Sequence, residues 1–393
     1  MNLTSLSASY LRARPLQTAL GLGLLALGVG TIVAAALVVG QLEARMARDA
    51  RGIDLVVGAK GSPIQLILSG IYQLDAPTGN IPASSVAFFE KNRLVRKAIP
   101  LALGDSWKGY RIVGARKDYL EHYQARFSSG RVFEKGMEAV LGYEVAARTG
   151  IGVGGRFVGA HGVGGEGEEH GETPYVVVGT LERTGSVLDR LVLTPIESVW
   201  AVHEHGKKEK DEDREVTVLL VQYATPLAAA SLPRAVNSKS ELQAASPAFE
   251  TARLFRIVGV GIEALRAFAA VLVLAAGLSV FIALYTALEE RRYDLAVMRT
   301  LGASPARLFG LLLFEGLLLA LAGALGGVIL GHLLAAVLGA WLQAAGQPAV
   351  SGLAFRVEEL WIVLGALAVG GVAALLPAWR AYRTDVSRTL AQG

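Results

Sequence analysis

Histidines and carboxylates gather in the glycine-rich stretch 159–172, and imidazole together with carboxylate is a ligand set that suits Zn²⁺. A second pair of histidines follows near residue 204. The candidate zinc ligands are His161, Glu166, Glu168, Glu169, His170, His203 and His205. No fixed ligand spacing joins them, and a glycine-rich acidic segment is also typical of a solvated loop. We interpret the stretch as a solvated loop and keep zinc binding as the alternative hypothesis.

The sequence lacks the common motifs of nucleotide hydrolysis and of hydrolytic catalysis. No Gly-x4-Gly-Lys-Ser/Thr phosphate-binding loop occurs, and residues 58–62 have the right residue types in the wrong arrangement. No Gly-x-Ser-x-Gly elbow and no His-Glu-x-x-His zinc motif is present. The chain has no cysteine, which excludes disulfides and thiolate chemistry. We expect a non-catalytic chain that binds no cofactor and does not hydrolyse ATP by itself.

A charged block over residues 289–307 separates two long apolar runs. Within it, Leu295, Met298 and Leu301 recur at helical spacing, which predicts one short amphipathic helix. Gly302 is placed to end this helix, and Ser304-Pro305 predicts the N-cap and first residue of the next helix. A helix in the membrane plane, joined tightly to two spans, can pass a push from a cytoplasmic partner into both.

Composition and apolar runs predict an integral membrane protein. The chain has 393 residues, of which 52% are hydrophobic and 18% charged. Four runs reach the roughly 20 residues that cross a bilayer, namely 16–40, 267–288, 308–342 and 360–379. A cleaved signal peptide is the alternative for the first run, because Arg12 and Arg14 precede it. Its apolar length exceeds the ~7–15 residues of a signal-peptide core, which favours an uncleaved anchor.

Basic residues near the ends of these runs predict the orientation of the chain. They flank the first run on its N-terminal side, fill the charged block and follow the last run, whereas the loop 343–359 carries just one, Arg356. We therefore place the termini (1–15 and 380–393) and the block 289–307 in the cytoplasm. The segment 41–266 then lies outside.

The outside segment predicts an α+β domain tied to the membrane by two charged helical stalks, 43–51 and 251–266. The expected strands are 55–58, 95–103, 111–115, 138–141, 156–159, 175–181, 191–194, 199–202 and 216–223. The expected helices are 64–72, 82–91, 142–149, 227–236 and 240–245. No proline interrupts either stalk, so each is predicted to continue its span as one rigid helix.

Two ionisable residues, Glu315 and His332, lie in or at the edge of the third run. Such groups within a span indicate a functional site by default. We expect a structural role for Glu315 near the cytoplasmic surface, and for His332 a hydrogen bond across a helix interface. Four such apolar spans would make a poor hydrophilic channel.

Residues 290–304 resemble the coupling-helix signature of the MacB/FtsX/LolC-type permeases, and residues 376–390 are similar to the C-terminal ending of that family. The order of one span, a large outside domain and three further spans also matches. Two further stretches, 57–63 and 75–82, look like a subgroup hallmark.

The resemblance implies a type VII ABC transporter permease: four transmembrane α-helices plus a large α+β periplasmic domain inserted between helices 1 and 2. It implies two permease copies in a bacterial inner membrane, two separate ATPase subunits that carry ATP and Mg²⁺, and periplasmic accessory or lipoprotein partners. The residues that would couple to the ATPase are Glu290, Arg291, Arg292, Tyr293, Asp294, Leu295, Met298, Arg299, Leu301 and Gly302.

Three functions follow as hypotheses. The leading one is a permease that transmits cytoplasmic ATP hydrolysis to the periplasmic domain and so extrudes or extracts a substrate there. The others are a zinc-handling membrane receptor and an exporter of an amphipathic or haem-like molecule. The formal net charge of +4 is modest and makes no case for a nucleic-acid partner.

Overall fold

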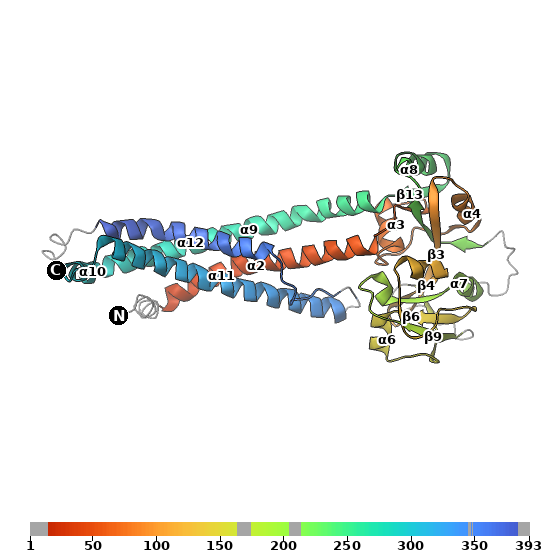
Figure 1. Cartoon of the computed structure of the whole chain (residues 1–393), viewed down its shortest axis with the longest axis horizontal. Coiled ribbons are helices and arrows are strands. Elements are labelled where there is room, and N and C mark those ends of the chain that lie inside the picture. Colours follow the sequence, from red (N-terminus) through yellow and green to blue (C-terminus); the bar gives the residue numbers. More distant parts are fainter. Residues whose placement is uncertain (1–14, 163–173, 204–213, 345–346, 348, 384–393) are drawn as a thin grey trace. The chain divides into compact units, whose positions relative to one another are not determined.

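The chain divides into two compact units in the computed structural model, which describes residues 15–162, 174–203, 214–344, 347 and 349–383 (Figure 1). The membrane unit comprises residues 1–42 and 258–393, and the sheet domain comprises residues 43–257. The boundary between them falls inside two long helices, α2 (Pro15–Asp49) and α9 (Pro247–Glu290). The predicted insertion of an α+β domain between the first two spans is thereby confirmed.

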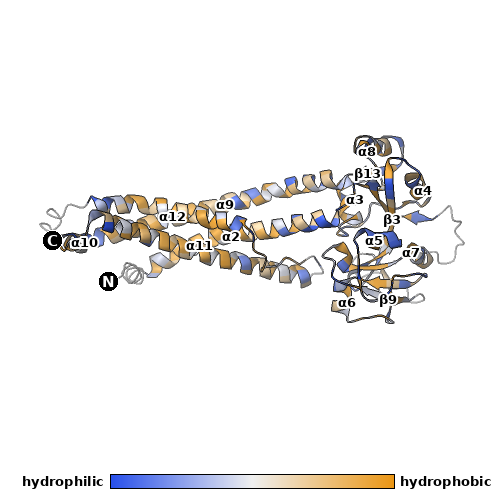
Figure 2. Ribbon diagram, viewed as in Figure 1, coloured by the Kyte–Doolittle hydropathy of each residue, from blue (hydrophilic) through white to orange (hydrophobic). Residues whose placement is uncertain are grey.

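The membrane unit is built from helices that are apolar over most of their length (Figure 2). Among the described residues, four helices are long and apolar enough to cross a membrane: α2, α9, α11 (Pro305–Ala344) and α12 (Glu358–Tyr382). The short helix α10 (Arg292–Thr300) connects α9 to α11. An α-helix satisfies its backbone hydrogen bonds internally, which is the condition for crossing hydrocarbon.

A row of small residues on α11 lets its neighbours approach closely. Toward α2, the glycines of this row meet large apolar side chains: a Cβ on Gly327 would lie 2.6 Å from the Cβ of Val29. Toward α12 the contact is small against small, since a Cβ on Gly370 would lie 2.3 Å from the Cβ of Ala320. The buried small residues of α11 are Gly316, Ala320, Gly323, Ala324, Gly327, Gly331, Ala335 and Gly339. Without a hydrophobic drive in lipid, such close backbone packing holds spans together.

Replacing Gly327 by alanine is expected to destabilise the membrane unit by about 1–3 kcal/mol, because the added methyl overlaps Val29 and the backbone oxygen of Ala26. The matched control is its neighbour Gly326, where a Cβ would meet the nearest atom, the Cβ of Ala26, at an ordinary 3.7 Å. Thermal unfolding of both variants in detergent checks this. Equal midpoints for Gly327→Ala and Gly326→Ala would refute the α2–α11 contact.

The sheet domain is organised around one mixed sheet with the strand order β13-β1-β12-β3-β4-β10-β6-β9-β5. Strands β10 and β4 pair in parallel, as do β6 and β9, and the other pairs along this path are antiparallel. β7 pairs with β9 and β8 with β3, while β2 and β11 form a separate pair. The strands are β1 (Leu55–Ala59), β2 (Ile81–Pro82), β3 (Val95–Trp107), β4 (Tyr110–Ala115), β5 (Phe127–Gly130), β6 (Glu138–Leu141), β7 (Arg156–Phe157), β8 (Ala160–His161), β9 (Tyr175–Leu181), β10 (Leu191–Pro195), β11 (Glu215–Val216), β12 (Val218–Tyr223) and β13 (Leu242–Ala245).

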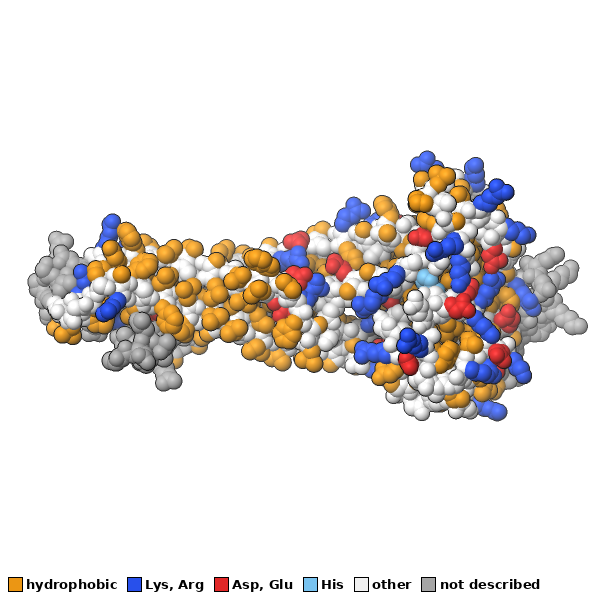
Figure 3. Space-filling view, viewed as in Figure 1, with side chains coloured by type: hydrophobic (Ala, Val, Ile, Leu, Met, Phe, Trp, Pro, Cys, Tyr) orange, Lys and Arg blue, Asp and Glu red, His pale blue; other side chains and the backbone are white. Residues whose placement is uncertain are grey.

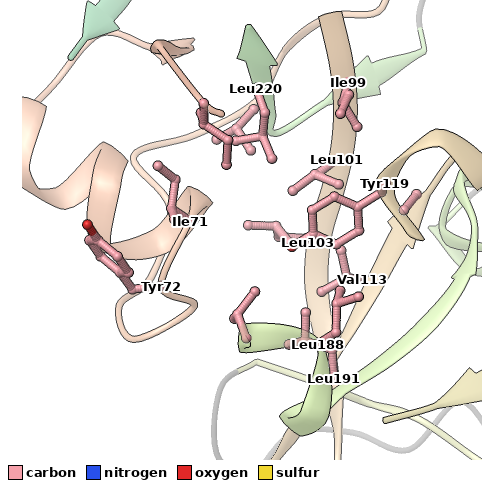
Figure 4. Close-up of a cluster of buried hydrophobic side chains, with 14 of the residues drawn as sticks. Ile71, Tyr72, Ile99, Leu101, Leu103, Val113, Tyr119, Leu188, Leu191 and Leu220 are labelled. Carbon is pink, nitrogen blue, oxygen red and sulfur yellow. The ribbon is translucent and has the colours of Figure 1, made fainter. Parts of the chain in front are cut away.

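Both faces of this sheet are covered by apolar side chains, which explains its continuous hydrophobic strands. In β1, Val56 packs into one cluster with Ile71 and Tyr119 (Figure 4), and its neighbours Leu55 and Val57 pack into another on the opposite face. The helices of the domain are α3 (Pro63–Gly70), α4 (Ser84–Glu90), α5 (Lys117–His122), α6 (Tyr143–Thr149), α7 (Ile196–His203) and α8 (Leu227–Lys239), with the short 3₁₀ turn η1 (Val187–Arg190). Both faces of the sheet therefore have to be covered by helices.

Two sequence predictions for this domain are wrong. Residues 199–202, predicted as a strand, belong to helix α7. Ile196 and Val199 lie three residues apart and pack together against Ala102 of β3, so the helical spacing prevails over the strand preference of valine.

Residues 240–245, predicted as a helix, contain the edge strand β13. Its alanines have no strand preference of their own, and pairing with residues 56–59 of β1 imposes the extended form. The side chain of Asn237 also bonds the backbone N–H and C=O of Ala244.

The ends of α2 and α9 that belong to the sheet domain are fixed by buried polar contacts. The carboxylate of Asp49, at the end of α2, accepts a hydrogen bond from the backbone N–H of Val187 at 2.8 Å. The backbone oxygen of Asp49 accepts another from the Tyr123 hydroxyl at 2.6 Å. In α9, the hydroxyls of Thr251 and Tyr72 are 2.8 Å apart. Both helices are thus anchored in the domain that they enter.

Candidate coupling site

The predicted amphipathic helix forms between α9 and α11, at the end of the bundle that we call the coupling end. α9 stops at Glu290 and α10 starts at Arg292, so a single residue, Arg291, separates them. Its N–H donates to the Ala287 oxygen at 3.1 Å, and its own oxygen accepts from Leu295 N–H at 2.9 Å. The hydrogen-bond ladder therefore continues through the bend, and α10 has little freedom to pivot about it.

The apolar side of α10 packs into the membrane unit. Leu295 and Ala296 are buried, and Met298 packs beside them. Leu295 and Met298 belong to a cluster that draws residues from the ends of three spans: Leu288 of α9, Leu308 and Leu312 of α11, and Ala378 and Ala381 of α12. Movement of α10 must therefore displace all three helix ends, since a close-packed cluster transmits strain.

The opposite side of α10 is free of this packing. Tyr293 has an exposed fraction of 54% and Leu301, at the tip, one of 82%. Arg292 is exposed and pairs with Glu289 at 3.1 Å. An exposed aromatic and an exposed leucine beside a charged rim are typical of a protein contact. Of the predicted coupling residues, Leu295 and Met298 thus face the bundle and Tyr293 and Leu301 face outward; the side chain of Asp294 lies outside the described residues.

The turn after α10 closes as the sequence predicts. Gly302 has φ of +98°. Its N–H donates to the Arg299 oxygen at 3.1 Å, and the next N–H, of Ala303, donates to the Met298 oxygen at 3.0 Å. This is the Schellman pattern of a helix end. The hydroxyl of Ser304 then accepts from the N–H of Arg307 at 3.3 Å and caps α11.

Replacing Gly302 by alanine is expected to cost about 1 kcal/mol and to loosen the coupling of α10 to α11, because positive φ is unfavourable with a Cβ. Gly310, inside α11, is the control. A Cβ at either position would meet no described atom within 4 Å, so the two variants differ in backbone conformation rather than in contacts. Gly310→Ala is expected to be neutral or stabilising. Thermal unfolding compares them, and equal effects would argue against the left-handed turn.

Glu315 reaches the coupling end from inside α11. Its side chain is 3% exposed, and its carboxylate lies 3.8 Å from the guanidinium of Arg291, whose side chain is 16% exposed. An ionised carboxylate in this surrounding needs a cationic partner. The pair therefore ties the bend before α10 to the third span, three turns beyond the exit turn.

Residues at the end of α12 complete the site, and the sequence analysis gave them no role. The Arg380 guanidinium donates a hydrogen bond to the Tyr285 hydroxyl of α9 and lies 4.8 Å from the centre of its ring. Trp379 stacks on Tyr382 and on the guanidinium of Arg383. A basic and aromatic cluster after a span was the available signal, but it was used for orientation and for the family resemblance and not for the coupling site.

His332 lies far from the coupling end, near the connection between α11 and α12. One ring nitrogen lies 2.7 Å from the backbone oxygen of Gly352, and the other 3.0 Å from a carboxylate oxygen of Glu359 in α12. His332 thus makes polar contacts with that connection and with the start of the last span.

Most of the predicted zinc ligands lie in parts of the chain that the structure does not describe, so the zinc prediction stays a prediction. Glu166, Glu168, Glu169, His170 and His205 lie outside the described residues. Only the backbone of His161, in β8, and of His203, at the end of α7, is described. Within the described part of the chain, no group of three or more His, Cys, Asp or Glu residues could hold a metal ion.

Comparison with known proteins identifies the membrane unit. Residues 266–386 match the family model of the FtsX-like permease C-terminal domain. The chain is also 31% identical over 121 residues to the lipoprotein-releasing system transmembrane protein LolE of Haemophilus influenzae. That match covers 27% of this chain and 29% of the relative, so the chain matches less than a third of the relative's length.

A solved structure resembles part of the chain more distantly. The extracellular domain of the noncanonic ABC-type transporter YknZ from Gram-positive bacteria is 12% identical, with a TM-score of 0.32, covering 48% of this chain and 98% of that one. The family model spans α10, α11 and α12 with their coupling end. Residues 266–386 therefore form an FtsX-like permease C-terminal domain.

Proposed function

We propose that this chain is the permease subunit of an ABC transporter and transmits ATP-driven motion from a partner ATPase to its sheet domain. The observation that carries the proposal is the two-sided packing of α10. Its apolar side is embedded in the ends of α9, α11 and α12, while Tyr293 and Leu301 are exposed on the other side. A partner bound to these two residues would push on three spans at once.

The proposed orientation places the coupling end in the cytoplasm of a bacterial cell and the sheet domain in the periplasm. Arginines gather at the coupling end, on α10 and at the end of α12, as the positive-inside rule requires. ATP is available in the cytoplasm alone, and the chain has no phosphate-binding loop of its own. The nucleotide must then be bound by a separate cytoplasmic subunit.

The proposed path of the motion follows α2 and α9. Each is one helix that belongs to both units, and Asp49 and Thr251 are held by hydrogen bonds within the sheet domain. A displacement of the membrane unit would reach the sheet domain through these two helices. We propose that two permease copies, each with an ATPase subunit, move their sheet domains against one another and so act on a substrate in the periplasm.

The packing of the ionisable residues favours transmission over a polar transport path through the spans. Glu315 is paired with Arg291, and His332 with Glu359, so both contact protein partners. The relative from Haemophilus influenzae is named for lipoprotein release. Since the match covers 29% of that relative, we do not extend its substrate to this chain. Zinc handling remains a separate hypothesis, to be tested by titrating the chain before and after replacing His161 and His170.

Reconstitution tests the proposed function. The full chain is co-expressed with each stand-alone ABC ATPase of its source genome, purified, and placed in lipid nanodiscs. One ATPase is expected to co-purify in equal number and to hydrolyse ATP faster with the permease than without it. If no ATPase binds or is stimulated, the proposal is wrong.

A further inference from the structure

The connection between α11 and α12 turns large apolar side chains away from the protein. Exposure alternates over residues 351–357, and the outward positions after Ser351 carry Leu353, Phe355 and Val357, with exposed fractions of 88%, 78% and 77%. A segment surrounded by water places polar residues outward and apolar residues inward. This segment does the reverse.

The inward side of the segment is fastened to the bundle. The side-chain amide of Gln41 in α2 donates to the backbone oxygen of Ser351 and accepts from its N–H, both at 2.8 Å. The backbone N–H of Arg356 donates to Glu359 at 2.9 Å, and the Arg356 guanidinium pairs with Glu358 at 3.0 Å. These polar groups are thus bonded within the protein, which is the condition for entering a medium poor in water.

The segment also returns along α11 toward the middle of the bundle. A Cβ on Gly339 would lie 1.9 Å from the oxygen of Val350, and one on Gly352 would lie 2.5 Å from the oxygen of His332. The connection therefore runs back along α11, and two extended residues descend by at most about 7 Å. The ring of Phe355 then lies tilted against that of His332, with the ring centres 4.6 Å apart. The apolar side chains lie well below the end of α11 at Ala344.

The length of α12 indicates where residues 351–357 lie relative to the bilayer. The apolar part of α12, residues 360–379, rises about 30 Å, which is the thickness of the hydrocarbon layer. Its start, at Glu359 and Leu360, therefore coincides with one boundary of that layer, and the segment 351–357 immediately precedes it. Exposed Trp361 lies at the same boundary, where tryptophan is enriched. Figure 3 shows exposed apolar side chains along the helices of the membrane unit.

We propose that Leu353, Phe355 and Val357 insert into the lipid leaflet at this end of the bundle and anchor the start of α12 at the membrane surface. The partner is the lipid interface itself, because the apolar side chains continue the lipid-facing surface of α12. The anchor holds the α11–α12 connection in place while the opposite, coupling end is free to be pushed. This inference does not depend on the identity of the ATPase or of any substrate.

The absence of cysteine from the chain allows a direct test with single-cysteine variants of the full protein. Leu353→Cys, Phe355→Cys and Val357→Cys carry a nitroxide spin label in vesicles of phosphatidylethanolamine and phosphatidylglycerol, diluted with unlabelled protein. Power saturation compares collisions with oxygen, which concentrates in lipid, and with a water-soluble nickel chelate. Glu241→Cys, whose side chain is 98% exposed in the sheet domain, is the water reference. Val372→Cys, exposed on α12, is the lipid reference.

The oxygen-to-nickel collision ratio at the three positions is expected to exceed that of Glu241→Cys several-fold and to approach that of Val372→Cys. A ratio equal to the water reference would overturn the proposal, because the segment would then be a solvent loop. Low collision rates with both reagents would also overturn it, since a second copy or another protein surface would then cover the segment. Because Phe355 contacts His332, Leu353 and Val357 keep the test valid if that one variant distorts the connection.

Discussion

Replacing Leu301 by glutamate is expected to abolish stimulation of the partner ATPase and to weaken its binding by about two orders of magnitude. Leu301, at the tip of α10, is 82% exposed. Burying a leucine in a partner contributes about 2–3 kcal/mol, and an unpaired charge in its place removes that contribution and adds a desolvation cost. Affinity is measured between the permease in nanodiscs and the purified ATPase, together with the rate of ATP hydrolysis.

The matched control is Leu227→Glu, which makes the same change on an exposed leucine of the sheet domain, outside the coupling end. It is expected to leave ATPase affinity unchanged. Equal losses in both variants would show that the effect does not come from the coupling end. Full affinity of Leu301→Glu would remove the tip of α10 from the contact. Leu295 is a poor choice for this experiment, because it is buried and its replacement would disrupt the cluster beneath α10.

Replacing Glu315 by alanine is expected to destabilise the membrane unit by about 3 kcal/mol and to uncouple ATP hydrolysis from the permease while the ATPase still binds. The change removes the carboxylate that lies 3.8 Å from the largely buried guanidinium of Arg291, and removing one member of a buried ion pair is costly. The bend before α10 would then lose its tie to α11. Thermal unfolding and the ATPase rate are measured on the same preparation, with binding as a separate readout.

A double-mutant cycle separates the ion pair from the rest of the site. Arg291→Met alone should be destabilising too, whereas Glu315→Ala combined with Arg291→Met should regain most of the lost stability, because neither charge remains buried. Additive losses in the double variant would mean that the two side chains do not act as a pair. Recovery of stability without recovery of the ATPase rate would assign the pair a role in coupling.

The sequence predicted the features whose cause is local. Apolar length was sufficient for the four spans, and helical spacing with Gly302 and Ser304 was sufficient for α10 and its exit turn. Alternating or continuous apolar runs located most strands of the sheet domain, since burial on one or both faces leaves that pattern. The predictions for residues 199–202 and 240–245 were wrong for one common reason. Packing against strands distant in the sequence decided the conformation of both segments, and a short sequence window does not contain those strands.

The candidate site could be located from the sequence, but the sequence did not show which side chains of α10 are buried against the bundle and which are exposed. Leu295 and Leu301 recur at helical spacing, yet the first is buried and the second is exposed. Leu301 lies just beyond the last residue of α10, Thr300. The pairs Arg291–Glu315 and His332–Glu359 join residues 24 and 27 positions apart on different helices. No spacing rule connects such positions, and their proximity depends on how the spans pack.

The glycine-lined contacts of α11 have a consequence for how faithfully the bundle responds. Where helices contact each other through long side chains, a change of rotamer can absorb a displacement of about an ångström. Gly327 and Gly370 have no side chain that could absorb a displacement between α11 and its neighbours α2 and α12. Helices α2, α11 and α12 are therefore expected to move together. A small displacement at one end of the bundle is then transmitted to the other end.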